Sequence, residues 1–240
     1  MAIIHDRSSK IVHRIFNCSF MNREPIFVSR IRDIASIYGL SIDAGMFALF
    51  QRYYELLNEW NTRVNLVSGR DLKRFAEYHI LDALKVASAF DFSCVHTMMD
   101  FGSGSGVPGI PLAISFPGIE TILVESRKKR FAFLEAACAF IPVPNARAVH
   151  SRIESLDRTL HDSFDAVITR ATVSLSDFYR LTSCFLKKNG SLIAIKGDTI
   201  SDEVTALNAI LDTAAFSLTT ATPKPLENVR SGTVVIMTRR

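Results

Sequence analysis

A glycine-rich turn between two apolar runs constrains the fold of this chain more than any other feature. Residues 99–109 read MDFGSGSGVPG, and the apolar run 110–116 follows them directly. This order predicts a strand, a tight turn and a helix. Three glycines at alternate positions let the backbone turn sharply and let a ligand approach closely. The amide groups of the turn point at that ligand, and Asp100 can accept hydrogen bonds from the loop or from a ligand amine.

The second landmark is an acidic residue at the end of the next apolar strand. Glu125 ends the run 121–125 and follows Gly102 by 23 residues, where an acid suits the hydroxyls of an adenosine ribose. The segment 104–109 also fits the dinucleotide pattern G-x-G-x-x-G, whereas the loop lacks the Gly-Lys-Ser or Gly-Lys-Thr ending of a P-loop. The residues therefore predict a nucleoside-containing cofactor, with a plain glycine-rich loop as the alternative.

From residue 95 onward, strand-like and helix-like segments alternate, which predicts an α/β fold. Right-handed crossovers then give a mostly parallel seven-stranded sheet with helices on both faces. Ligands bind beyond the carboxyl ends of such strands. Asp100, Glu125, Glu154 and Arg170 all fall at predicted strand ends, so they should surround one crevice. The predicted strands are 95–99, 121–125, 146–150, 164–171, 191–196 and, as an antiparallel edge, 216–222 and 233–238.

The N-terminal part of the chain is predicted to be an accessory segment. Residues 1–30 scatter basic side chains among polar ones and indicate an irregular extension. Residues 31–92 should form a helical segment packed on the main domain, 93–240. Ser41 is expected to cap a helix with an apolar stripe at spacings of three and four. A second helix should hold His79, either as a structural histidine or as a positioning group for catalysis.

Four consecutive cations, Arg127, Lys128, Lys129 and Arg130, are predicted in the first turn of a helix. Positive charge there opposes the helix dipole by roughly a few tenths of a kcal/mol per side chain. A locally unfavourable choice indicates function. Contact with phosphate is therefore one interpretation, and a solvated charged turn is the other.

A later helix carries signals for both of its ends. Ser174 and Asp177 resemble a capping box at its start. The residues 187–190 read KKNG, and lysines followed by glycine are typical of a helix C-terminus. We therefore expect this helix to run from Ser174 to about residue 188.

Composition limits the class of protein. The 240 residues are 48% hydrophobic, which is enough for one α/β core, and the net charge of +4 permits a nucleic-acid partner without requiring one. The four cysteines are far apart, so we expect no metal site, a reducing cytoplasm, and buried thiols at Cys138 and Cys184. The longest uncharged run, 101–119, is the ligand loop, so we expect no membrane span. We also expect a monomer.

Together these motifs resemble the RsmG (GidB) family of S-adenosylmethionine-dependent methyltransferases, from residue 34 to residue 240. The extension of the glycine loop through Gly109-Ile110-Pro111 is far more specific than a glycine loop alone. The residues that carry the resemblance are Trp60-Asn61, Asn65-Leu66, His79–Asp82, Asp100–Pro111, Glu125-Ser126, Lys129-Arg130, Ser151–Glu154, Phe164-Asp165, Arg170-Ala171 and Lys196-Gly197. The resemblance implies a Rossmann-like class I methyltransferase fold. It also implies methyl transfer to N7 of a guanine in bacterial 16S ribosomal RNA. The RNA substrate would be either free RNA or RNA within the small ribosomal subunit or its precursor.

The resemblance further implies a binding site for S-adenosyl-L-methionine. The glycine loop would hold its methionine part, Glu125 its ribose, and Ile153 and Glu154 its adenine. The full set of implied cofactor-binding residues is Asp100, Gly102, Gly104, Gly106, Val107, Glu125, Ile153, Glu154 and Arg170.

The chemistry implied by the resemblance needs no obvious base, because guanine N7 has no proton to remove. Alignment for in-line transfer is most of the task. Arg170 and Lys196 would therefore position RNA phosphate, cofactor carboxylate or guanine O6, and His79 is a third positioning candidate. Tyr78 stands where the family usually has Arg, so one phosphate interaction is missing or is made elsewhere.

Two other functions fit parts of the sequence. An NAD-dependent oxidoreductase would share the G-x-G-x-x-G pattern, but the chain has no Tyr-x-x-x-Lys pair for hydride transfer. A non-catalytic RNA-binding or ribosome-assembly factor would keep the cofactor-binding fold without the reaction. A methyl-transfer assay separates this last alternative from the enzyme.

Overall fold

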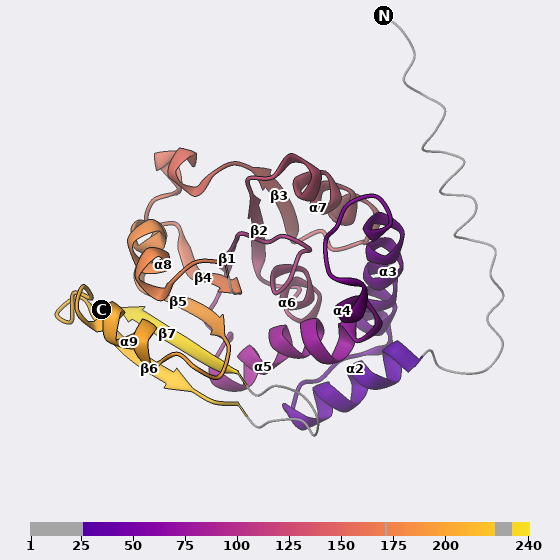
Figure 1. Ribbon diagram of the computed structural model, residues 1–240, viewed down its shortest axis with the longest axis horizontal. Helices are drawn as coiled ribbons and strands as arrows, with labels where there is room; N and C mark the ends of the chain where they lie inside the picture. The colour runs from indigo at the N-terminus through magenta and orange to yellow at the C-terminus, as the bar shows by residue number, and fades with distance from the viewer. Residues whose placement is uncertain (1–25, 171, 224–231) are drawn as a thin grey trace, which may run out of the picture.

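The computed structural model describes residues 26–170, 172–223 and 232–240, and within them a seven-stranded sheet in the order β3-β2-β1-β4-β5-β7-β6 (Figure 1). The strands are β1 (Thr97–Phe101), β2 (Glu120–Glu125), β3 (Ala146–His150), β4 (Phe164–Arg170), β5 (Leu186–Lys196), β6 (Phe216–Ala221) and β7 (Thr233–Arg239). The first five strands are parallel, and β7 pairs antiparallel with β5 and β6. The predicted mostly parallel sheet with an antiparallel edge is confirmed.

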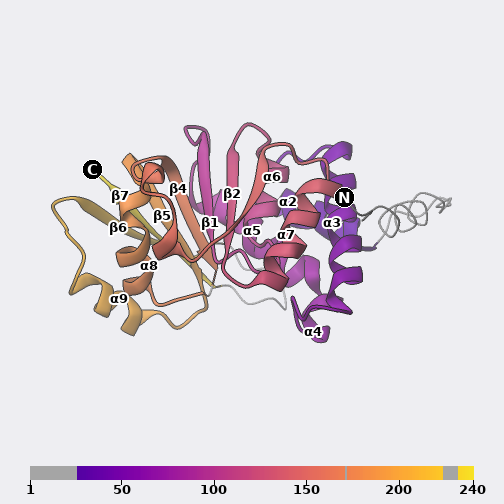
Figure 2. The same ribbon diagram turned by 90° about the horizontal axis from the view of Figure 1, so that it is seen from above.

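Helices cover both faces of the sheet, as Figure 2 shows. One apolar core is formed by one face of the sheet and by side chains of α2 (Ile26–Ile37), α3 (Ala44–Asn61), α5 (Leu81–Ala89), α6 (Gly109–Ser115) and α7 (Lys128–Phe140). The other lies between the sheet and α8 (Leu175–Thr182) and α9 (Ser201–Asn208). Met98 belongs to the first core and its neighbour Met99 to the second, because successive side chains of a strand point to opposite faces. Strands buried on both faces need continuous apolar runs, and the central strand segments of this sequence are such runs.

The N-terminal helices pack directly on the sheet-covering helices. α3 contacts α6 and α7, and α5 contacts α6. Between α3 and α5 the chain forms the short helix α4 (Gly69–Lys73) and a π-helical turn, Ala76–Ile80. α2 begins at Ile26, so the last five residues of the stretch expected to be irregular are helical, and residues 1–25 lie outside the described part of the chain.

Asp43 caps α3, and the prediction of Ser41 as the cap was wrong. The Asp43 carboxylate accepts a hydrogen bond from the backbone amide of Met46 at 2.8 Å. Both residue types suit an N-cap. The choice follows from packing, because Leu40 and Ile42 lie against the core and hold the preceding segment out of the helix.

α8 ends earlier than its sequence signals indicated. Ser174 caps it as predicted, since its hydroxyl accepts from the Asp177 amide at 3.1 Å. The helix ends at Thr182, however, and a 3₁₀ turn, Ser183–Phe185, leads straight into β5. The side chains of Phe185 and Leu186 are buried, so the chain joins the sheet before 187–190 can form a helix end. Cys184 is consequently exposed rather than buried, and Cys138 is only partly buried.

Gly109 begins α6 at a point where there is no room for a side chain. A Cβ at this position would collide with the Leu123 side chain and would lie 2.6 Å from Asp100 Oδ2. Gly109→Ala should therefore lower the free energy of unfolding by about 1–3 kcal/mol. Gly118→Ala is the matched control, because nothing lies within 4 Å of its Cβ position. Urea unfolding measures the stability of both variants. Equal unfolding midpoints for Gly109→Ala and Gly118→Ala would show that α6 can shift away from the sheet without a loss of stability.

Candidate active site

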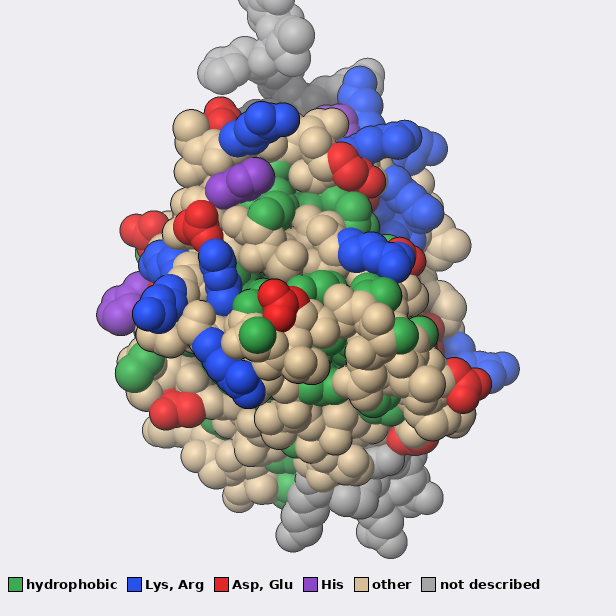
Figure 3. All heavy atoms as spheres, turned by 90° about the vertical axis from the view of Figure 1, so that its left-hand side faces the viewer, with side chains coloured by type: hydrophobic (Ala, Val, Ile, Leu, Met, Phe, Trp, Pro, Cys, Tyr) green, Lys and Arg blue, Asp and Glu red, His purple; other side chains and the backbone are tan. Residues whose placement is uncertain are grey.

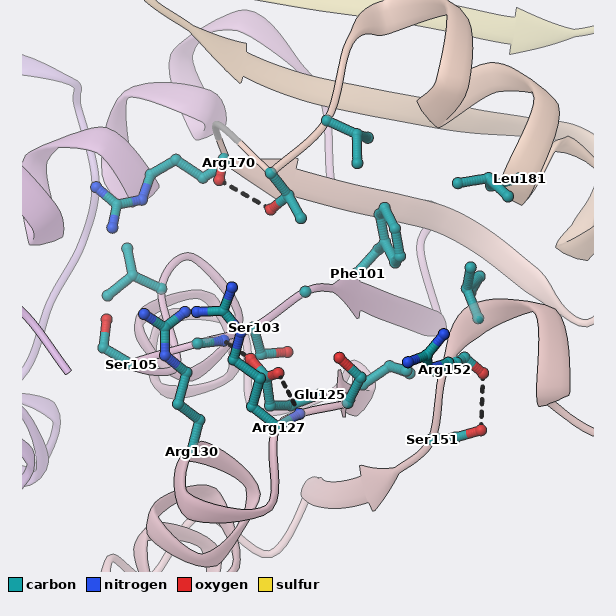
Figure 4. Close-up of a pocket in the computed structure, with 18 of the residues that line it drawn as sticks. Phe101, Ser103, Ser105, Glu125, Arg127, Arg130, Ser151, Arg152, Arg170 and Leu181 are labelled. Atoms are coloured by element: carbon teal, nitrogen blue, oxygen red, sulfur yellow. Dashed lines mark hydrogen bonds between the residues drawn. The ribbon is translucent and has the colours of Figure 1, made fainter. Parts of the chain in front are cut away.

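A cavity of about 660 Å³ opens beyond the carboxyl ends of β1, β2 and β4 (Figure 4). Its lining includes Gly102, Gly104, Val107, Glu125, Ile153, Glu154 and Arg170 from the predicted cofactor-binding set. The strand ends thus converge on one crevice, as the topology required. Asp100 and Gly106 do not line it, and Asp100 is fully buried.

The glycine loop follows a backbone path that residues with a side chain rarely adopt. Gly102, Gly104 and Gly106 have φ angles of 72°, 55° and 88°, in the left-handed region that favours glycine. A Cβ on Gly102 would also lie 2.6 Å from Thr172 Cγ2. The loop after β4 therefore packs directly against the glycine loop, and the two form adjacent walls of the cavity.

Glu125 holds two backbone segments together at the end of β2. Its Oε2 accepts from the Gly104 amide at 3.0 Å and its Oε1 from the Arg127 amide at 2.7 Å. The side chain is 5% exposed. A carboxylate has about four acceptor positions, so lone pairs remain for ligand hydroxyls at the cavity surface.

Asp100 supports the same loop at its C-terminal end, where α6 begins. Its Oδ2 accepts from the Gly109 amide at 2.9 Å, and its Oδ1 has no hydrogen-bond partner among the described residues. Burial raises the pKa of this carboxyl from 3.8 to about 7, and the Glu125 carboxylate adds to the increase. Asp100 is fully buried and is not part of the cavity lining, so the structure shows it supporting the loop, and its direct contact with a ligand stays a prediction.

The N-terminal helices contribute to the site in two ways that the sequence did not reveal. Tyr53 of α3 is fully buried, and its hydroxyl donates to the Ser105 carbonyl of the glycine loop at 2.6 Å. Asn61 accepts from the amides of Leu66 and Val67 at 2.9 and 3.0 Å, which fixes the turn that places Leu66 in the cavity lining. A tyrosine in an apolar stripe, whose buried hydroxyl needs a partner, was the available signal for the first contact.

Besides Arg170, three arginines line the cavity: Arg127, Arg130 and Arg152 (Figure 4). The Arg130 guanidinium reaches the glycine loop, 3.5 Å from the place of a Cβ on Gly104. Lys128 and Lys129 are exposed and lie outside the lining. Figure 3 shows a different face, the left-hand side of Figure 1 with β6, β7 and α8, where Lys and Arg are scattered with Asp and Glu among them.

Arg170 and His79 lie where the N-terminal helices meet the sheet. The side chain of Arg170 extends from β4 toward these helices (Figure 4), and its Nη1 lies 3.4 Å from Asp82 Oδ2. Asp82 also accepts from the buried Lys85 at 2.6 Å. His79 is buried, and neither ring nitrogen has a hydrogen-bond partner among the described residues. Burial, with Arg170 nearby, lowers the pKa of His79 from 6.5 to about 4, so it is neutral at pH 7, and it does not line the cavity.

Lys196, which the sequence predicted to face the substrate or the cofactor, lies behind the cavity wall. Its Nζ donates to the Val173 carbonyl at 2.6 Å and to Glu203 Oε2 at 2.7 Å, and its side chain is 8% exposed. It does not line the cavity. In this structure the ammonium of Lys196 is engaged behind the loop after β4, and its direct contact with RNA, cofactor or guanine stays a prediction of the sequence.

Two further findings concern the described residues as a set. They contain no group of three or more His, Cys, Asp or Glu side chains arranged to hold a metal ion. Within the same ranges, no helix has the length and hydropathy of a membrane span.

The sheet order, the glycine loop after β1 and the acid after β2 define a Rossmann-like fold of the class I methyltransferase type. A precorrin-6y C5,15-methyltransferase from Geobacter metallireducens has a similar fold, with a TM-score of 0.51 and 15% sequence identity over 67% of this chain and 87% of that chain. The chain belongs to the GidB family, described as rRNA small subunit methyltransferase G, whose model matches residues 46–224.

Relatives named ribosomal RNA small subunit methyltransferase G share about a third of their aligned residues with this chain. The protein of Chlorobaculum tepidum is 35% identical over 167 residues, which cover 70% of this chain and 76% of the relative. The Nitrosococcus oceani protein is 36% identical over 72% of this chain and 78% of the relative. The Bacillus subtilis protein is 33% identical over 70% and 71%, respectively.

Asp100 gives the structure a testable pH dependence. Its pKa is about 7 in the folded chain and 3.8 ordinarily, so the folded chain binds this proton more tightly. The stability from this group is complete below about pH 4 and is lost as the pH rises through about 7. Asp100→Asn removes the titration. The unfolding free energy of the variant minus that of the wild type should therefore rise with pH, by up to about 1.4 kcal/mol per pH unit.

Urea unfolding at several pH values between about 5 and 8 measures this difference. Taking the difference between the two proteins cancels the contribution of His79, whose lowered pKa has the opposite effect: stability is lost as the pH falls from 6.5 toward about 4. A difference that does not change with pH would mean that Asp100 titrates with an ordinary pKa.

Proposed function

We propose that this chain transfers a methyl group from S-adenosyl-L-methionine to N7 of a guanine in 16S ribosomal RNA, as a monomer in the cytoplasm. One observation carries the proposal: in a member of the rRNA small subunit methyltransferase G family, the glycine loop, Glu125 and Ile153-Glu154 line one cavity. The RNA substrate is inferred from the description of the family and from the names of the relatives. The guanine N7 target follows from the family resemblance of the sequence.

The lining fits the three parts of S-adenosylmethionine. Backbone amides of the glycine loop suit the methionine carboxylate, because the loop turns without side chains in the way. Glu125 has acceptor positions left for the ribose hydroxyls. Ile153 is 5% exposed and apolar, which suits a face of the adenine, and Glu154 lies beside it.

The chain's own task is alignment. Bound S-adenosylmethionine supplies a methyl group already activated on a sulfonium, and guanine N7 offers a lone pair with no proton to remove. The residues must therefore hold the two groups in line and exclude water. Leu66 and Val173 line the cavity with apolar surface that can flank a base. Arg170, tied to Asp82, sits where a guanine O6 or an RNA phosphate can be held.

Cations around the cavity provide the RNA contacts. Arg127, Arg130 and Arg152 line it, and Lys128 and Lys129 extend the positive surface outward from the start of α7. Phosphate contacts fix the register of a bound nucleic acid without reading its sequence. The basic turn therefore docks the RNA, and the cavity selects the base.

The direct test incubates the protein with methyl-labelled S-adenosylmethionine and 16S RNA, naked or in small subunits, from cells that lack this gene. Mass mapping of digested RNA should place one added methyl on a guanine. Cofactor binding without transfer would instead indicate a non-catalytic assembly factor. Thermal stabilisation by NAD(H), and not by S-adenosylmethionine, would indicate an oxidoreductase.

Glu125→Ala should weaken S-adenosylmethionine binding by about 1–3 kcal/mol, the usual loss for a charged hydrogen-bond partner. Glu120→Ala is the matched control, because Glu120 begins the same strand at its opposite end and is exposed. Calorimetry measures both affinities. A Glu125→Ala protein with the affinity of the control would remove Glu125 from the cofactor site.

Replacing Lys128 and Lys129 by Gln should weaken RNA binding and lower the slope of log affinity against log salt by roughly one for each phosphate that is no longer neutralised. Cofactor affinity should not change, because neither side chain lines the cavity. Titrations at several salt concentrations measure the slope. An unchanged slope would show that these two lysines form only a solvated surface.

A further inference from the structure

The loop between β4 and α8, residues 172–174, forms one wall of the cavity. Thr172 and Val173 line it, and Thr172 packs against Gly102 so closely that a Cβ there would lie 2.6 Å from its methyl carbon. β4 ends at Arg170 and α8 begins at Leu175, so these residues have no sheet partner. Something outside the sheet must hold this wall in place.

An ion pair behind the wall provides that anchor. Lys196, at the end of β5, donates to the Val173 carbonyl at 2.6 Å and to Glu203 Oε2 at 2.7 Å. The same Glu203 oxygen accepts from the Leu175 amide at 2.9 Å. One ion pair therefore binds the backbone on both sides of Ser174.

The surroundings make this anchor rigid. Lys196 is 8% exposed and commits two of its three donors to these partners. Glu203 comes from the first turn of α9, which packs against α8. The ion pair is buried on its lysine side, whereas the Glu203 side chain is 36% exposed. A charge-assisted hydrogen bond is stronger than a neutral one, so the pair favours one position of the loop.

We infer that Glu203 and Lys196 are positioning residues for methyl transfer: their ion pair sets the loop 172–174 against the glycine loop, where the target base meets the methyl donor. This inference rests on the proposed function. Neither side chain lines the cavity, so both act through the wall that they hold. Misplacement of that wall by a fraction of an ångström should reduce the rate of transfer more than the binding of either reactant.

The test compares Glu203→Ala with Asp202→Ala. Both remove a carboxylate from the first turn of α9, so the cost to the helix is matched. Asp202 is exposed, and its carboxylate lies 3.4 Å from the hydroxyl of its neighbour Ser201. The readouts are the single-turnover rate of RNA methylation, the affinity for S-adenosylmethionine, and hydrogen exchange at the Leu175 amide.

Glu203→Ala should slow single-turnover transfer about tenfold or more, leave cofactor affinity within about threefold, and speed exchange at Leu175. Asp202→Ala should match the wild type in all three. Glu203→Gln keeps an acceptor oxygen at the same reach and should recover most of the rate. If Glu203→Ala does not fold, Lys196→Met replaces it in the test. This variant removes the other half of the ion pair and should slow methyl transfer to the same extent.

Equal transfer rates in Glu203→Ala and Asp202→Ala would overturn the positioning role, and unchanged exchange at Leu175 would overturn the anchor itself. Failure of the proposed function is a separate result, because the wild-type protein would then transfer no methyl to the RNA. The exchange measurement still reports on the anchor in that case.

Discussion

The site depends on buried carboxyl groups that hold backbone amides at the ends of adjacent strands. Glu125 binds the amides of Gly104 and Arg127, and Asp100 binds that of Gly109. A loop of glycines has the largest conformational entropy to lose on folding, so these bonds are needed to give it one shape. They fix both ends of the loop relative to α6 and α7, and the cavity forms in the space that they define.

The segment before β1 completes this site as well as covering the core. Tyr53 bonds the carbonyl of Ser105, Asn61 shapes the turn that presents Leu66, and Asp82 holds Arg170. Each contact joins the accessory helices to a residue of the cavity lining. A change in how these helices pack would therefore be transmitted to the glycine loop and to the end of β4.

The sequence predicted the structure most accurately where local pattern and global fold agree. The parallel strands, the antiparallel edge and the Ser174 cap were predicted because apolar periodicity and side-chain capping act over a few residues. It failed where a local signal competed with packing. Asp43 rather than Ser41 caps α3 because Leu40 and Ile42 bind the core, and the helix end signal at 187–190 was overridden by the burial of Phe185 and Leu186.

The sequence by itself determined the fold class, the glycine loop after β1 and the acid that bonds to it, because each is encoded within a short stretch of chain. Only the tertiary structure decided which of the candidates line the cavity. Asp100, Gly106, His79 and Lys196 carry suitable chemistry but are buried or engaged elsewhere, whereas Leu66, Thr172 and Arg152 line it. The direction and burial of a side chain depend on contacts between residues far apart in the chain, and these contacts form only when the chain has folded.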